Sequence, residues 1–200
     1  MSWRFHASRT DLSIEVPLMT EVYDPRCIAN LMLDESERIG QPLTNLALQK
    51  LLYFAHAIFL IERGRPLVSG YFEAWEYGPV NPAAYQAFKR AGAEPIGFRA
   101  VKLNVVDGSR EPIASPRDPE IVRHISRIVQ SYGRMTPGRL VDISHAKGAP
   151  WHFVVDKGRT SLAFGMRIPD EVIRERFKYH KVSVGSQPSA GEPREDTPFA

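Results

Sequence analysis

The fold of this 200-residue chain is decided by the stretch LALQKLLYFAHAIFLIER, residues 46–63. Over residues 51–61 the stretch is apolar on nearly every side, so a helix formed here must run through the hydrophobic core. Thr44 or Asn45 supplies an N-cap before the helix, and Gly64 follows as a stop. The sequence therefore predicts a buried central helix around which the other elements pack.

Polar side chains are few on this helix, and three of them form one stripe. Gln49, Tyr53 and His56 fall within about 60° of arc at 100° per residue. Buried polar groups need hydrogen-bond partners. These three either bond to backbone carbonyls or carboxylates as structural groups, or they line a polar pocket. Such a pocket would include one acid of the later segment EAWEY, Glu73 or Glu76.

Further helices are marked by a capping residue that is followed by proline, and several of them end near glycine. In the fourth expected helix the apolar residues recur at helical spacing between positions 121 and 132. Pro150 starts a brief turn through WHFVV. Apart from the central helix, the expected helices span residues 25–38, 83–91, 119–132, 137–147 and 171–179.

Strand-type residues occur in two segments. The first, residues 97–113, surrounds Asp107-Gly108, which is the commonest short-hairpin signal. The second, YFEAWEY, residues 71–77, favours a strand that ends at Gly78. The sequence thus predicts an α+β fold, a mostly helical single domain with about six helices around a buried central helix and a small antiparallel β-sheet or hairpin.

The domain is expected to cover residues 23–182. Residues 1–22 form an N-terminal extension. Residues 183–200 are rich in Pro, Ser and Gly without periodicity, which predicts a disordered tail.

The segment EAWEYGPVNP, residues 73–82, places two acids among aromatic residues and then stiffens the chain with two prolines. The glycine and the prolines predict a rigid corner, which would hold the aromatic side chains as preorganised anchors for a partner. Strand alternation points the two acids in opposite directions. One acid should therefore be buried against Tyr53 and His56, while the other stays exposed. The candidate partner-binding residues are Glu73, Trp75, Glu76 and Tyr77.

Composition narrows the classes of function. No apolar run is long enough to span a membrane and no secretory signal is present, so a cytoplasmic location is expected. The single cysteine, Cys27, excludes an internal disulfide and a multi-cysteine metal site. A formal charge of +3 with scattered basic residues falls short of a nucleic-acid-binding signature.

Motifs for catalysis are missing from the sequence. It has no nucleophile elbow, no nucleotide-binding glycine loop and no standard zinc spacing, since His145 and His152 lie seven residues apart. We therefore expect no catalytic residues, no metal and no cofactor. A small hydrolase that uses His56 and Glu76 is an alternative, but it lacks an activated nucleophile.

Two long motifs carry a resemblance to a known family. LTNLALQKLLYFAHAIFL, residues 43–60, followed by GRPLVSGYFEAWEYGPVNPAAYQAFKRAG, residues 64–92, resembles the Panacea domain, or SocA-like antitoxin-associated domain. DISHAKGAPW, residues 142–151, and IPDEVIRERF, residues 168–177, resemble later parts of the same family. The resemblance covers roughly residues 22–180.

The resemblance implies an antitoxin of a two-gene toxin–antitoxin system, whose partner is a cognate toxin neutralised by direct contact. At least one member of the family instead acts as an adaptor that delivers its toxin to a protease, so a protease is a second implied partner. A homo-oligomer is compatible with the sequence. A nucleic-acid-binding regulator of its own operon is the remaining alternative, although no polar recognition helix stands out.

Overall fold

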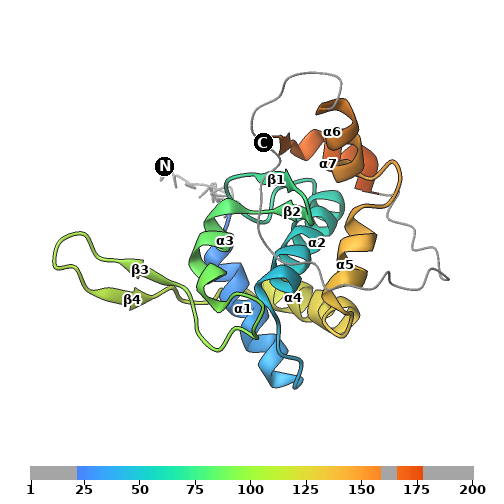
Figure 1. Ribbon diagram of the computed structural model, residues 1–200. Helices are drawn as coiled ribbons and strands as arrows, with labels where there is room; N and C mark the ends of the chain where they lie inside the picture. Colours follow the sequence, from blue (N-terminus) through green and yellow to red (C-terminus); the bar gives the residue numbers. More distant parts are fainter. Residues whose placement is uncertain (1–21, 159–165, 178–200) are drawn as a thin grey trace, which may run out of the picture.

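The computed structural model describes residues 22–158 and 166–177 of the chain (Figure 1). The predicted N-terminal extension up to residue 21, the predicted tail from residue 183 and the end of the last predicted helix lie outside the described residues. The described residues are mostly helical and carry two small antiparallel sheets, so the predicted α+β class is confirmed.

Helices begin where the capping residues predicted them. Each of four caps accepts a hydrogen bond from a backbone N–H in the first turn of its helix and is followed by proline: Asp24, Asn81, Asp118 and Thr136. The helices of the described residues are α1 (Pro25–Arg38), α2 (Asn45–Arg63), α3 (Pro82–Phe88) with the 3-10 helix η1 (Lys89–Ala91), α4 (Pro119–Tyr132), α5 (Pro137–Ser144), α6 (Pro150–Gly158) and α7 (Asp170–Arg176).

Two helix predictions differ from the structure. Where the sequence predicted only a brief turn from Pro150, the chain forms the nine-residue helix α6. This helix packs against β1 (Phe72–Trp75), β5 (Arg167–Ile168) and α7, contacts that a short apolar run does not reveal in the sequence. The helix before it, α5, ends at Ser144, earlier than the predicted stop at Gly148.

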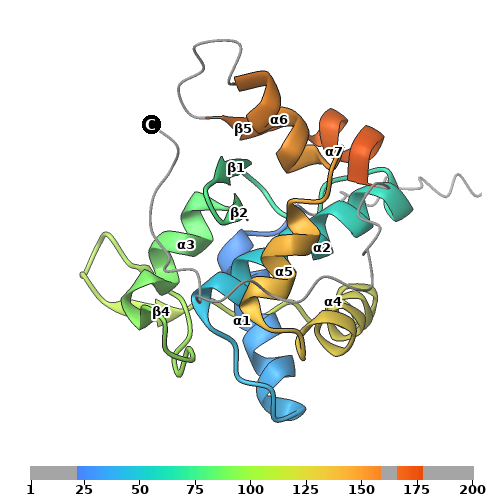
Figure 2. The same ribbon diagram turned by 45° about the vertical axis from the view of Figure 1, so that its right-hand side comes forward.

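The central helix α2 passes through the core, as the sequence predicted. It contacts α1, α3, α4, α5 and α7, which surround it in Figure 2. Every residue from 45 to 57 is buried, and solvent is reached only near the C-terminal end, where the side chain of Ile61 is 48% exposed.

The strand β1 is the middle strand of a three-stranded antiparallel sheet, between β2 (Gly78–Val80) and β5. Trp75 lies opposite Gly78, so Glu76 and Tyr77 form the two-residue turn between β1 and β2. The predicted strand therefore ends two residues early, because the chain turns back at Gly78, which has a φ of +95°. Phe72 and Ala74 face the core, whereas Glu73 and Trp75 are half-buried on the outer face.

The predicted hairpin is formed by β3 (Val101–Leu103) and β4 (Arg110–Pro112), a separate two-stranded antiparallel sheet. The hairpin extends away from the helices (Figure 1). Its base is bound to α1 through Asn30, a buried side chain. The Asn30 Nδ2 donates to the carbonyls of Ala100 and Ile113, and its Oδ1 accepts from the Ala100 N–H.

Candidate functional site

Gln49 of the predicted polar stripe links α2 to the corner that follows β2. Its Oε1 accepts a hydrogen bond from the Asn81 N–H at 3.0 Å, and its Nε2 donates to the Asn45 Oδ1 at 3.3 Å. Asn81 in turn caps α3 and donates from Nδ2 to the Tyr71 carbonyl. Gln49 thereby holds the start of α3 against the central helix.

His56 meets a carboxylate, but one from the far end of the described chain. Its Nε2 lies 3.1 Å from the Asp170 Oδ1, and its Nδ1 accepts from the Val68 N–H at 3.4 Å. With Nδ1 as acceptor, the ring proton is on Nε2 and is donated to Asp170. This hydrogen bond lowers the pKa of Asp170. The pair ties α2 to the start of α7.

Replacing His56 by Ala should lower the free energy of unfolding by about 1–3 kcal/mol. The variant removes the acceptor of the Val68 N–H and the donor to Asp170, and it leaves a gap in a site where His56 is 3% exposed. Chemical denaturation measures the loss, with Asp170→Asn as a control that removes only the carboxylate. Unchanged stability together with a loss of partner binding would show that His56 serves recognition rather than the fold.

Tyr53 is fully buried and its ring lies in an aromatic cluster. The ring centroid is 5.4 Å from that of Phe72 and 5.9 Å from that of Phe177, both in edge-on geometry. Burial raises the pKa of Tyr53 well above its usual value, so its hydroxyl stays protonated at physiological pH. The ring packs β1 and the end of α7 onto α2.

The prediction that one acid of EAWEY is buried against Tyr53 and His56 is wrong. Phe72 fills that place, since its ring contacts both Tyr53 and His56, at 5.4 and 5.2 Å between centroids. Glu73 is on the opposite face of the sheet and Glu76 is exposed in the turn after β1. His56 and Glu76 are therefore not brought together, and the structure does not form the pocket that a hydrolase would need from them.

Lys50 is a site residue that sequence reasoning missed. It is fully buried and its Nζ donates to the Pro79 carbonyl at 2.9 Å, beneath the corner between β1 and α3. The sequence signal for it is a lysine on a helix that is otherwise apolar on nearly all sides, which predicts a buried lysine with a hydrogen-bond acceptor. Buried lysines need hydrogen-bond acceptors, so this contact fixes the corner onto α2.

The other side of the same corner is held by α5 and α6. The Trp151 indole N–H donates to the Trp75 carbonyl at 2.8 Å, and the Trp151 ring stacks on His145 at 3.6 Å between centroids. Burial lowers the pKa of His145 to about 3, with a smaller contribution from the charge of Lys50, so the imidazole is neutral. The turn that carries Glu76 and Tyr77 is thus flanked by two fixed backbone carbonyls, that of Trp75 bound by Trp151 and that of Pro79 bound by Lys50.

The outer face of the sheet presents aromatic side chains to solvent. The Trp75 ring packs edge-on against Tyr85 of α3 at 4.7 Å, and its indole N–H donates to the Glu73 Oε2 at 2.8 Å. The Arg167 guanidinium of β5 lies 3.8 Å from the Tyr71 ring centre. We call this surface, made of Tyr71, Glu73, Trp75, Tyr85 and Arg167, the aromatic face.

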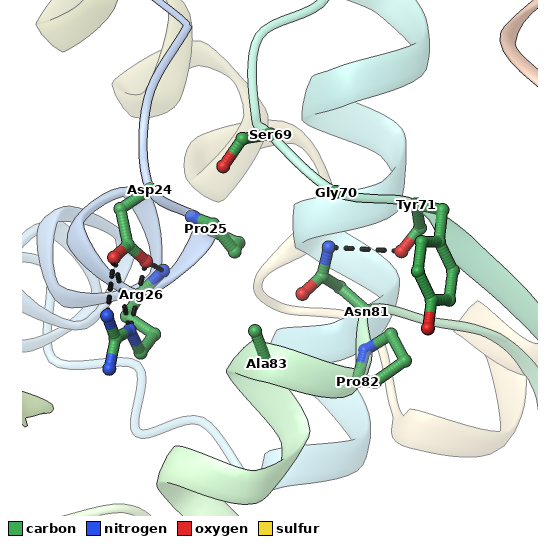
Figure 3. A pocket seen from close by; sticks show the side chains of 9 residues that line it. All are labelled: Asp24, Pro25, Arg26, Ser69, Gly70, Tyr71, Asn81, Pro82 and Ala83. Carbon is green, nitrogen blue, oxygen red and sulfur yellow. Dashed lines mark hydrogen bonds and ion pairs between the residues drawn. The ribbon is translucent and has the colours of Figure 1, made fainter.

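A pocket of about 320 Å³ lies between the starts of α1 and α3 and the segment before β1 (Figure 3). Its two charged side chains are paired with each other, since the Arg26 guanidinium binds the Asp24 carboxylate at 2.7 Å. Arg26 thereby lowers the pKa of Asp24. The one acid and the one base of the lining are thus paired with each other, and the pocket carries no net charge.

Residues 22–158 and 166–177 carry neither a metal-binding cluster nor a membrane-spanning helix. In this part of the chain no three His, Cys, Asp or Glu side chains gather closely enough to hold a metal ion. None of its helices combines the length and the apolar character needed to cross a bilayer.

Comparisons with known proteins agree on one family. The family model described as "Antitoxin SocA-like, Panacea domain" matches residues 48–152. The chain is 45% identical over 175 residues to Antitoxin SocA of Caulobacter vibrioides (strain NA1000 / CB15N), which covers 88% of this chain and 93% of that protein. No solved structure matches the chain.

Proposed function

Because this chain belongs to the SocA-like Panacea family, we propose that it is the antitoxin of a two-gene toxin–antitoxin system and neutralises its cognate toxin by direct protein–protein contact. The observation that carries the proposal is the 45% identity to Antitoxin SocA, which extends over 93% of that protein. The chain would act in the cytoplasm, without catalysis and without a cofactor.

The aromatic face and the adjoining turn support contact with a protein. Trp75 and Tyr71 are large aromatic side chains on an outer sheet face, and exposed Tyr and Trp are favoured as interface anchors. Lys50 and Trp151 bind the backbone carbonyls on either side of the turn. The turn is therefore already ordered, and binding of a partner costs little further conformational entropy. Glu73, Trp75, Glu76 and Tyr77 therefore remain our proposed toxin-binding residues.

Charge indicates what kind of toxin surface fits there. Glu76 is exposed at the tip of the turn, and Glu73 is half-buried beside Trp75. Toxins that act on RNA or nucleotides present basic active sites, which would be attracted by these two carboxylates. A toxin bound here would have its active site covered or its substrate blocked.

The function is tested by co-expression with the product of the neighbouring gene. That protein alone should stop growth, and co-expression of this chain should restore it, with a complex recovered on purification. A neighbouring gene whose product is harmless in every host tested would overturn the simplest form of the proposal. Rescue that requires an intact cytoplasmic protease and shortens the toxin's half-life would indicate proteolytic delivery in place of simple neutralisation.

Two substitutions at the proposed surface should weaken toxin binding at least tenfold, about 1.4 kcal/mol or more. Trp75→Ala removes the anchor, and Glu76→Lys reverses the exposed charge. Glu76 is exposed, so Glu76→Lys should keep the circular dichroism spectrum and the melting temperature of the parent. Trp75 is half-buried and packs against Tyr85, so Trp75→Ala should keep the circular dichroism spectrum but unfold at a lower temperature. Titration calorimetry with the neighbouring gene product measures the affinity.

The matched control for Glu76→Lys is Glu94→Lys, an equal change of charge at an exposed position in the loop after η1. This control should bind as the parent does. If Trp75→Ala and Glu76→Lys are folded and rescue growth normally, the aromatic face and its turn are not the toxin-binding surface.

A further inference from the structure

The register of the three-stranded sheet brings a carboxylate and a guanidinium opposite each other on the aromatic face. Glu73 of β1 is the cross-strand partner of Arg167 of β5. The next pair in the register, Phe72 and Ile168, is buried in the core, so Glu73 and Arg167 both lie on the outer side. Side chains directly opposite each other on one face are about 5 Å apart at Cβ, and opposite charges in such positions attract. An ion pair within the chain is therefore expected here.

The structure does not form this ion pair. The Arg167 guanidinium instead lies over the Tyr71 ring, 3.8 Å from its centre. Glu73 uses its Oε2 to accept a hydrogen bond from the Trp75 indole N–H at 2.8 Å. Among the described residues no cation pairs with Glu73, and no donor reaches its Oε1. The half-buried Glu73 thus presents a carboxylate whose charge the described chain does not balance.

The rings beside this carboxylate are fixed in place. Trp75 is oriented by its hydrogen bond to Glu73 and by edge-on packing against Tyr85, with 4.7 Å between the ring centroids. The faces of aromatic rings attract cations. A carboxylate with aromatic rings at its side is therefore complementary to a basic side chain, whose charge meets the acid while the rest of the side chain covers the rings.

Burial by a partner makes a cation necessary at this place. A protein that covers the aromatic face removes Glu73 from water, and a carboxylate that is buried without a partner is strongly unfavourable. Arg167 could move to Glu73 only by giving up its contact with the Tyr71 ring. A cation of the covering protein meets no such cost, so the group that binds at Glu73 is a basic side chain of that protein.

Arginine fits this site better than lysine. Its guanidinium is planar and weakly hydrated, so it can stack on the Trp75 ring while one N–H donates to the Glu73 Oε1. The same type of contact is already made on this face by Arg167 over Tyr71. A second copy of this chain that packed by the same face would have to use its own Arg167, and that guanidinium is held by Tyr71.

We propose that Glu73, flanked by the rings of Trp75 and Tyr85, receives an arginine side chain of the cognate toxin. Tyr71 keeps Arg167 away from Glu73, so the carboxylate stays available to the toxin. The toxin arginine then forms the ion pair that the register offers to Arg167. The proposal rests on the proposed function, since it names the group of the toxin that the same surface binds.

The first test removes the charge of Glu73 and little else. Glu73→Gln keeps an oxygen that can accept the Trp75 indole N–H, so the ring should stay oriented and the variant folded. It should weaken binding of the neighbouring gene product about tenfold or more in titration calorimetry. The matched control is Glu94→Gln, which removes one carboxylate at an exposed position in the loop after η1 and should bind as the parent does.

The second test concerns the role of Tyr71. Tyr71→Leu frees Arg167 to pair with Glu73, so it should also weaken binding of the neighbouring gene product. Adding Arg167→Gln to Tyr71→Leu removes the competing cation and should restore most of the affinity. If the double variant binds as weakly as Tyr71→Leu alone, Tyr71 does not act by holding Arg167, and that part of the proposal is wrong.

The third test identifies the arginine in the toxin. Each arginine of the neighbouring gene product is replaced by glutamine in turn, and binding to the parent and to Glu73→Gln is compared. One replacement should weaken binding to the parent about tenfold or more and have little further effect on Glu73→Gln, which is the signature of a direct pair in a double-mutant cycle. Coupling to a lysine, or to no basic residue, would overturn the arginine assignment.

Failure of this site and failure of the proposed function have different outcomes. Parent-like affinity in folded Glu73→Gln overturns the arginine site and leaves the antitoxin function in place. A parent dimer that Glu73→Gln converts to monomers in analytical ultracentrifugation would assign the carboxylate to self-association, against the proposal. A parent chain that binds no neighbouring gene product overturns the proposed function, and the arginine site with it.

Discussion

Replacing Gly78 by Ala should destabilise the protein by about 2–5 kcal/mol, from a left-handed backbone and overpacking together. Gly78 has a φ of +95°, which L side chains rarely adopt. A Cβ at this position would collide with the buried Ser144 Oγ and would lie 3.1 Å from the Lys50 Cε and 3.3 Å from the His145 Nε2. Thermal and chemical denaturation measure the loss, which is a large part of the stability of an ordinary domain.

Two further variants separate the causes of this loss. Gly64→Ala is the matched control, because Gly64 has a φ of +68° but no heavy atom within 4 Å of an added Cβ. It should cost only about 1–2 kcal/mol, the backbone contribution. Adding Ser144→Ala to Gly78→Ala removes the nearest colliding atom and should recover part of the stability. If Gly78→Ala costs no more than Gly64→Ala, the corner is not packed as tightly as its contacts indicate.

Replacing Tyr53 by Ala should lower the free energy of unfolding by about 3–5 kcal/mol, as for other large aromatic residues removed from a core. The ring lies between α2, β1 and α7 and contacts Phe72 and Phe177. Its loss would leave a cavity that backbone elements on three sides cannot close. Urea denaturation monitored by fluorescence measures the change.

The control for this variant is Tyr53→Phe, which keeps the ring and removes the hydroxyl. We expect it to retain most of the stability, because the ring makes the aromatic contacts. If Tyr53→Phe is as damaging as Tyr53→Ala, the hydroxyl rather than the ring carries the energy. If Tyr53→Ala is nearly neutral, the aromatic cluster does not support the sheet.

Much of the candidate site could be placed from the sequence, but its partners could not. Helical periodicity puts Gln49, Tyr53 and His56 on one side of α2. The sequence also places Glu73 and Glu76 near a rigid corner. It could not show that Phe72 separates these acids from the stripe, because the strand ends at Trp75 and its alternation of faces does not extend to Glu76 in the turn.

What the sequence by itself determined is local. Helix starts follow from a side-chain cap and a proline with its fixed φ, and both act within a few residues, as at Asp118 before α4. The burial of α2 follows from apolar residues on nearly all its sides. The tertiary structure alone decided the pairings between distant segments. His56 meets Asp170 across 114 residues, and β5 completes a sheet with only two residues of strand. Such contacts depend on how helices and sheet pack, and no short-range periodicity encodes which of several carboxylates will be brought to a buried histidine.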